Sequence, residues 1–158
     1  MKKLIVVFLI ILTLTGCKTN EKDIKKEEYL QIKKELIENK EFSSLEDLDF
    51  DLNISIDRIT EDEISYRAII DNPKTNMYNV KAIIIHDNEN NEEIFPSIGI
   101  LDEPIDLIIA NEEIKGISLI GYIKTNKDIE TIDLNIKVYV EYINEQNETI
   151  KIYYKTTN

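Results

Sequence analysis

Every second residue is apolar in Ile132-Asp-Leu-Asn-Ile-Lys-Val-Tyr-Val-Glu-Tyr142. Successive side chains of a β-strand point to opposite faces of a sheet, so strict alternation over this length predicts a strand with one buried face. The stretch therefore predicts strands, and not helices, across residues 115–155.

The same period of two recurs along most of the chain. The alternating sets are Leu52, Ile54 and Ile56; Ile64, Tyr66, Ala68 and Ile70; Tyr78, Val80, Ala82 and Ile84; Ile117, Leu119, Gly121 and Ile123; and Ile150, Ile152 and Tyr154. Polar turns divide them, and shorter pieces around Pro96, Gly99 and Pro104 are typical of edge strands or bends. Seven or eight strands predict an all-β fold, an immunoglobulin-like antiparallel β-sandwich.

The last two strands predict their own register. If Tyr142 and Ile150 both face the core, the loop between the strands has an odd number of residues. Pairing Asn144 with Glu148 leaves a three-residue turn that ends at Asn147. The last position of such a turn usually adopts the left-handed conformation, which asparagine tolerates.

Several side chains opposite the core set are less polar than a solvent-facing surface requires. These residues are Ile69, Ile83, Ile85, Ile120 and Tyr122, on three strands that could be neighbours. Either a helix covers them, or they form an exposed apolar patch that binds a partner. The hairpin register also places Tyr139 opposite Tyr153 on this outer side.

A helix is expected over residues 24–39, because strong helix formers dominate and glycine and proline are absent. Tyr29, Ile32 and Leu36 recur at helical spacing and form a narrow apolar stripe. The stripe fits a helix packed on the domain or a spacer; the alternative is an amphipathic helix that binds a membrane or partner. Ser43 and Glu46 have the spacing of a capping box that opens a short helical turn.

The N-terminus has the layout of an export signal, with two lysines followed by an apolar run from Leu4 to Leu12. That run is too short to span a bilayer. Leu14-Thr15-Gly16-Cys17 resembles the lipobox of bacterial lipoproteins, in which the cysteine is lipidated and becomes the new N-terminus. The resemblance implies a cleaved signal peptide, a lipid anchor at Cys17, and a place on the extracytoplasmic face of the cell membrane.

The expected organisation is a signal peptide over 1–16, a lipidated tether over 17–23, a helical stalk or packed helix over 24–50 and the sandwich over 51–158. Within the sandwich, residues 64–85 contain a strand, an Asn-Pro turn and a second strand that begins Tyr-Asn-Val-Lys. This pattern resembles small immunoglobulin-like domains of bacterial surface lipoproteins, many of them of unknown function.

The charge of the chain limits its partners. From Glu41 to Asn158 there are 25 acidic and 10 basic residues, whereas residues 17–40 are nearly neutral. Binding to nucleic acid requires a basic face, so we expect no nucleic-acid partner. The lysines near Cys17 can lie against anionic lipid headgroups.

Residues that could support chemistry are few. His86 is the sole histidine and is expected at the surface or in a turn; Cys17 is the sole cysteine, which excludes an intramolecular disulfide. Residues 87–93 could hold Ca²⁺ weakly, although a solvated hairpin tip is favoured. Asp102, Glu103 and Asp106 could be imagined as an acid and base pair, but nothing marks them as buried. We expect no catalytic residue, no metal site and no cofactor.

The sequence thus predicts a lipid-anchored protein of the cell envelope that binds or supports an extracytoplasmic partner and is not an enzyme. An alternative is an immunity or inhibitor type lipoprotein that sequesters an envelope enzyme or toxin through its acidic surface. A third possibility is a Ca²⁺-dependent adhesion module.

Overall fold

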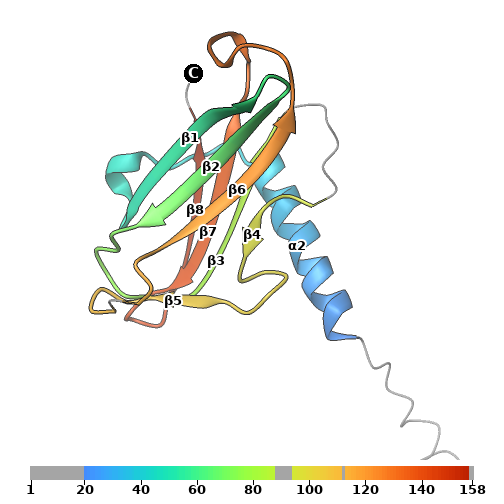
Figure 1. Ribbon diagram of the computed structural model, residues 1–158. Coiled ribbons are helices and arrows are strands. Elements are labelled where there is room, and N and C mark those ends of the chain that lie inside the picture. The colour runs from blue at the N-terminus through green and yellow to red at the C-terminus, as the bar shows by residue number, and fades with distance from the viewer. Residues whose placement is uncertain (1–19, 88–93, 112, 157–158) are drawn as a thin grey trace, which may run out of the picture.

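The computed structural model describes residues 20–87, 94–111 and 113–156. Within these ranges one α-helix precedes eight strands. Figure 1 shows how they are arranged. The elements are α2 (Glu21–Glu38), η1 (Leu45–Asp47), β1 (Asp51–Thr60), β2 (Glu63–Asp71), β3 (Met77–His86), β4 (Ser97–Ile98), β5 (Ile105–Leu107), β6 (Gly116–Lys124), η2 (Ile129–Thr131), β7 (Ile136–Ile143) and β8 (Thr149–Lys155).

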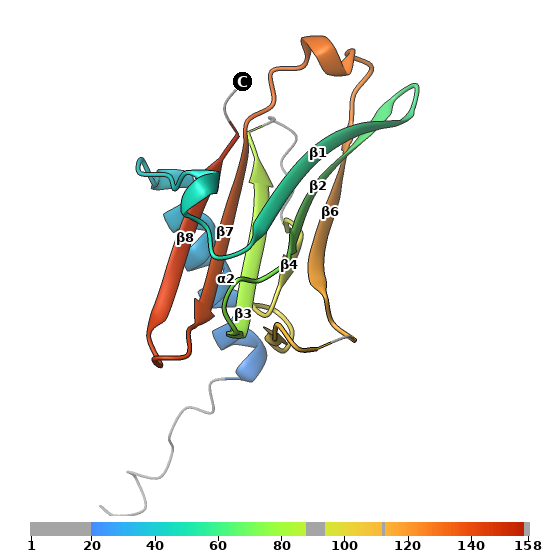
Figure 2. The ribbon, with the colours of Figure 1, turned by 90° about the vertical axis from the view of Figure 1, so that its left-hand side faces the viewer.

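The strands form two antiparallel sheets that face each other (Figure 2). The first sheet has the order β1-β2-β6; the second has the order β4-β3-β7-β8, with β5 paired to β3. In an immunoglobulin-type sandwich, strands A, B, E and D share one sheet and strands C, F and G the other. The orders β1-β2-β6 and β3-β7-β8 correspond to A-B-E and C-F-G, and the predicted all-β antiparallel sandwich is confirmed.

The main core lies between the two sheets, and the alternating residues supply it. On β6 every second side chain, from Ile117 to Ile123, is buried, while those between them are exposed. The fully buried large side chains of this core include Phe50, Ile64, Tyr66, Ile70, Met77, Ile84, Leu107 and Tyr142. Each such side chain contributes roughly 1.5–3 kcal/mol when it leaves water.

One residue predicted for the core lies outside it, because β3 contains an irregularity. Asn79 adopts a positive φ of 52°, and the pairing of β3 with β7 shifts between Tyr78 and Lys81. The extra residue turns the side chains that precede it to the opposite face of the sheet. Met77 is therefore fully buried and Tyr78 is not, contrary to the alternation Tyr78, Val80, Ala82.

The predicted register of the last hairpin is confirmed. Asn144 accepts the backbone hydrogen bond of the turn from Asn147 and donates its own backbone N–H to Glu148 at 2.9 Å, while Asn147 has a φ of 64°. Tyr139 lies opposite Tyr153, with ring centroids 5.2 Å apart. The three-residue turn thus determines which residues of β7 and β8 lie opposite each other.

Helix α2 packs on the outer face of the second sheet, so the packed interpretation of this segment is confirmed. Tyr29, Ile32 and Leu36 are buried, while Leu30 and Ile37 remain about half exposed. The buried stripe meets Ile83, Ile85, Phe95, Ile100 and Tyr139 to form a second, smaller core. The helix begins at Glu21, three residues earlier than expected.

Charged side chains fasten α2 to the sheet. Lys81 of β3 forms ion pairs with Glu28 of the helix and with Glu141 of β7. Burial works to lower the pKa of Lys81, but the hydrogen bond to Glu28 and the attraction of both carboxylates raise it above its usual value. Lys137 donates to the backbone oxygens of Leu36 and Ile37 at 3.2 and 2.7 Å, which satisfies carbonyls left free at the end of the helix.

Two expected boundaries differ from the structure. Ser44, and not Ser43, caps the short helical turn, because its Oγ accepts a hydrogen bond from the backbone N–H of Glu46 at 3.3 Å. Strand β7 begins at Ile136, and Ile132 and Leu134 precede it. They still pack on the core, since the chain enters the strand from the 3₁₀ turn η2 with the same side inward.

Glycine is required at position 121 because the Tyr66 side chain of the neighbouring strand lies against the backbone there. It lies opposite Tyr66, and a Cβ atom at this position would stand 2.2 Å from the Cζ atom of that buried ring. We expect Gly121→Ala to lower the free energy of unfolding by about 1–3 kcal/mol through overpacking. Urea denaturation measures this, with the outward-facing Ser118→Ala as control, and equal stabilities of the two variants would contradict the packing.

Candidate functional site

The five apolar residues predicted to share one outer patch are divided between the two sheets. Ile83 and Ile85 lie on β3 beneath α2 and are 0% and 4% exposed. Ile69, Ile120 and Tyr122 lie on β2 and β6 in the other sheet. The assumption that the three strands are neighbours is therefore wrong, because β2 and β3 are joined by a connection that crosses between the sheets. Helix α2 thus covers Ile83 and Ile85, whereas Ile120 and Tyr122 are exposed and Ile69 is half-buried.

We call the outward side of the β1-β2-β6 sheet the open face, since α2 packs on the other sheet. Ile120 and Tyr122 are 38% and 54% exposed there. Arg67 lies opposite Ile120 on β2 and forms no ion pair with any residue in the described ranges. Ser65, opposite Tyr122, is almost completely buried. The open face thus combines an arginine, a tyrosine and an isoleucine, of which the first two are enriched at binding hot spots.

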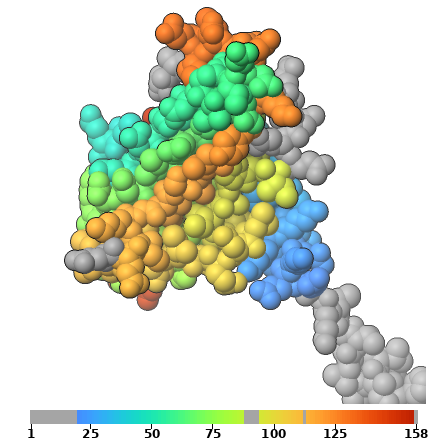
Figure 3. Space-filling model, viewed as in Figure 1, coloured from blue at the N-terminus to red at the C-terminus, as the bar shows by residue number. Residues whose placement is uncertain are grey.

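A groove of about 580 Å³ runs between β6 and the segment 94–102. Its walls are Ile120, Gly121 and Tyr122 on one side and Ile94, Phe95, Pro96, Ser97, Leu101 and Asp102 on the other. Figure 3 shows β6 in orange, with the yellow segment and the blue helix α2 beside it on the same surface. The groove therefore lies at the edge of the first sheet, where that sheet meets the irregular segment.

A second groove, of about 360 Å³, continues from the first toward the beginning of α2. Its lining includes Leu30 and the side chains of three lysines, Lys22, Lys25 and Lys26. Ile94 and Leu101 line both grooves, so the two are continuous. We call the exposed side chains along them the apolar strip: Leu30, Ile94, Leu101, Ile120 and Tyr122, which are 50%, 66%, 38%, 38% and 54% exposed.

Contacts from α2 hold the middle of the apolar strip in place. The Tyr29 hydroxyl accepts a hydrogen bond from the backbone N–H of Phe95 at 2.6 Å. The ammonium group of Lys33 lies 4.7 Å from the centre of the Phe95 ring, which is a cation–π distance. Lys25 pairs with Glu103 at 2.7 Å, and this bond raises the pKa of Lys25 and lowers that of Glu103. The segment 94–102 is therefore fixed by the helix although it has little regular structure.

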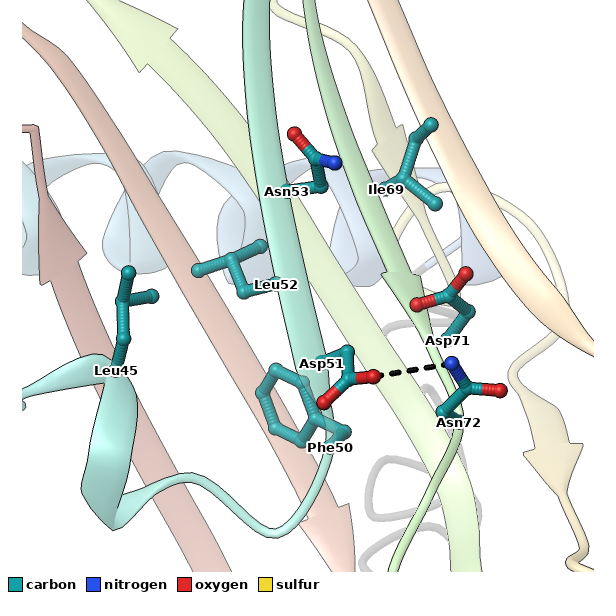
Figure 4. Close-up of a pocket in the computed structure, with 8 residues that line it drawn as sticks. All are labelled: Leu45, Phe50, Asp51, Leu52, Asn53, Ile69, Asp71 and Asn72. Carbon is teal, nitrogen blue, oxygen red and sulfur yellow. Dashed lines mark hydrogen bonds between the residues drawn. The ribbon is translucent and has the colours of Figure 1, made fainter.

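A third hollow, of about 410 Å³, lies at the beginning of β1 (Figure 4). Asp51 and Asp71 are opposite each other in the sheet, and the side-chain amide of Asn72 donates to Asp51 at 3.0 Å. Within the described ranges no group of three or more His, Cys, Asp or Glu side chains could hold a metal ion. This hollow therefore offers no metal centre among those residues.

The polar residues singled out in the sequence are not gathered into one site. Asp102 accepts from the backbone N–H of Gly99, Glu103 pairs with Lys25, and Asp106 accepts from the backbone N–H of Asn79. Each carboxylate thus has a separate structural partner. His86 is 7% exposed and lies edge-on to the rings of Tyr66 and Phe95, so the expected surface position of this histidine is wrong.

Two expected sites lie outside the described residues. Cys17, the residue proposed for lipidation, is one of them, and so are positions 88–93 of the segment considered for Ca²⁺. In the part of the chain that the structure describes, no helix has both the length and the apolar character needed to cross a membrane.

Ile94, Leu101 and Leu30 were not predicted to share one surface. Leu30 lies far from the other two in the sequence, and none of the three belongs to a period-two pattern. The one available signal was the presence of apolar residues in the segment around Pro96, Gly99 and Pro104. A scan against models of protein families and searches of curated proteins and solved structures find no match to this chain.

Proposed function

We propose that this protein is a lipid-anchored, extracytoplasmic binding module of the cell envelope without catalytic activity of its own. The lipobox-like residues that end in Cys17 support the anchor. Helix α2 begins four residues later, at Glu21, and packs directly on the sandwich. The anchor would therefore hold the domain close to the membrane surface, with no long flexible linker between them.

The apolar strip is the observation that carries the binding role. Five exposed apolar side chains from three separate segments line one continuous pair of grooves. Contiguous apolar surface with a polar rim usually marks a contact site, because water leaves such a surface when a partner binds. Lys22, Lys26 and Asp102 supply the polar rim.

Anchoring is tested by cell fractionation. We expect Cys17→Ala to release the protein from the membrane fraction, because no thiol is then present at the lipobox-like site to receive the acyl chains. The wild-type chain is the control. Membrane retention of the variant equal to that of the wild type would remove the anchoring part of the proposal.

Binding is tested by pull-down of envelope extract with residues 18–158, which contain the whole described fold. Ile94→Lys places a charge in the apolar strip, and we expect it to abolish capture of the partner that the wild-type chain retains. Ile59→Lys is the matched control, since Ile59 is 52% exposed on β1 and lies outside the strip. Equal loss in both variants, or loss in neither, would contradict a role for the strip.

An immunity or inhibitor type function is the second candidate, favoured by the excess of acidic residues from Glu41 onward. Binding through this acidic surface should weaken steeply as salt rises, because charges on opposing surfaces are screened. Binding through the apolar strip should be nearly insensitive to salt. Repeating the pull-down at low and high salt separates the two candidates.

A further inference from the structure

Strand β6 has an open edge. Among the described strands it pairs with β2 alone. The pairing continues to Thr125, whose backbone N–H donates to Asp62 at 2.8 Å. Residues of an antiparallel strand direct their backbone groups alternately toward and away from the neighbour. Counting from Thr125, Ser118, Ile120 and Tyr122 therefore direct their N–H and C=O groups toward the open edge.

The other long edges are protected in ways that hinder pairing. Strand β1 has a shift in register between Arg58 and Thr60, and it carries three charged residues, Asp51, Asp57 and Arg58. On β8, the backbone oxygen of Tyr153 accepts from the N–H of Ser43 at 2.8 Å. Bulges and covering segments are common means of protecting an edge strand.

The edge of β6 shows no such device among the described residues. The strand has nine residues without a shift in its pairing to β2, contains no proline, and has a single charged residue, Lys124, at its end. The groove that borders Ile120 and Tyr122 follows the same edge. Unpaired backbone groups and an adjoining apolar groove occur together at one place.

The shape of this place admits a single strand more readily than a second sandwich. The segment 94–102 forms the far wall of the groove, and Figures 1 and 2 show it on the open side of β6, between the layers of the two sheets. A second copy of the domain would have to occupy that space with a complete sheet. One extended chain needs only the width of a strand, about 5 Å.

Basic side chains accompany the edge, although acidic residues predominate in the domain. Lys115 precedes β6 and Lys124 ends it, and Glu63 lies opposite Lys124 on β2. Arg67, beside Ile120, has no ion pair with the described residues, and its Nε atom is buried without a hydrogen-bond partner. A carboxylate brought by the incoming chain would complement this guanidinium.

We propose that the partner of this binding module is an extended peptide segment that adds to β6 as a further strand of the first sheet. Its backbone bonds the open edge at Ser118, Ile120 and Tyr122. Its inward side chains are apolar and lie on the groove wall formed by Ile94 and neighbouring residues, and an acidic side chain on its outward row faces Arg67. Peptide addition to a sheet edge is an established mode of recognition. The inference rests on the proposed binding function and names the class of partner.

The test uses a nine-residue capped peptide with valine at the even positions, glutamate at position 5 and threonine at the other odd positions. Amide hydrogen exchange is followed by NMR on residues 18–158. We expect the exchange of the Ser118, Ile120 and Tyr122 amides to slow at least tenfold on addition of peptide, because these N–H groups become bonded. The amides of Leu119 and Gly121, which already bond β2, should change little. Absence of this alternation at saturating peptide overturns the proposal.

Two variants of the same experiment test the contacts. Ile120→Pro removes an N–H from the open edge while leaving the bonds to β2, and should weaken binding at least tenfold relative to Ile120→Val. Should the proline variant not fold, a peptide N-methylated along its bonding edge tests the same bonds on the wild-type chain. Undiminished binding in this test counts against strand addition.

The acidic contact is tested by Arg67→Gln. This change should weaken binding of the glutamate peptide about fivefold or more and leave a peptide with central glutamine unaffected. Equal effects on both peptides contradict the pairing with Arg67. Retained capture of an envelope partner through Ile94, with no alternating protection of β6 by peptide, would overturn strand addition and leave the proposed function intact. Loss of both would remove the two together.

Discussion

Leu36→Ala is expected to lower the free energy of unfolding by about 2–5 kcal/mol. Leu36 is fully buried between α2 and the second sheet, and truncation there leaves a cavity in the smaller core. Urea denaturation followed by circular dichroism measures the change. Leu30→Ala is the matched control, because it makes the same substitution on the same helix at a position that is 50% exposed. The control should change stability by less than about 0.5 kcal/mol.

The result measures how much the packing of α2 contributes to the stability of the domain. If the helix packs as described, its loss exposes Ile83 and Tyr139, which are completely buried beneath it. Unfolding should then occur in one transition that includes the helix. Equal stabilities of the Leu36 and Leu30 variants would mean that the helix contributes nothing to the fold.

The second large effect is a loss of stability at alkaline pH that depends on buried tyrosines. Burial, together with a hydrogen bond donated to Asp49, raises the pKa of Tyr142 to about 12. Burial, reinforced by a hydrogen bond to Glu141, raises the pKa of Tyr139 further above its usual value. Both hydroxyls therefore keep their protons in the folded state at pH values where an unfolded tyrosine has lost its own.

The sign of the effect follows from this difference. An unfolded tyrosine has a pKa of about 10, so the contribution of Tyr142 is complete below pH 10 and is lost as the pH rises from 10 to about 12. Each pH unit in that window removes about 1.4 kcal/mol for one such group. Denaturation at pH 9, 10, 11 and 12 should therefore show stability falling above pH 10.

Tyr142→Phe is the control for that titration. The variant loses the hydrogen bond to Asp49 at every pH but has no hydroxyl to ionise. The stability advantage of the wild-type protein over the variant should thus shrink by about 2–3 kcal/mol between pH 9 and pH 12. A constant difference between the two proteins over that range would show that Tyr142 is not held as described.

Local patterns predicted much of the fold because their causes are local. The alternation on β6 became a strand with every second side chain buried. The stripe of Tyr29, Ile32 and Leu36 became the buried side of α2. The candidate site was predicted only in part: Ile120 and Tyr122 were named, whereas Ile94 and the other members of the apolar strip were not.

Some differences arise where a single residue changes the geometry of its neighbours. Because Asn79 has a positive φ, Met77 lies in the core and Tyr78 does not. The alternation of apolar residues does not indicate this irregularity. His86 lies at the end of β3, a position expected to be polar, yet Tyr66 and Phe95 enclose it from two other segments. Burial of such a residue depends on partners that are distant in the sequence.

The sequence by itself determined the all-β class, the register of the last hairpin and the apolar stripe of the helix, since side-chain period and turn chemistry act over a few residues. Only the tertiary structure decided which outer apolar residues are covered and which are open. The chain crosses between sheets after β2, so α2 covers Ile83 while Ile120 stays exposed beside the edge of β6 that no described strand pairs with. The physical reason is that a period of two shows which side chains share one face of a strand. It does not show which other element packs on that face.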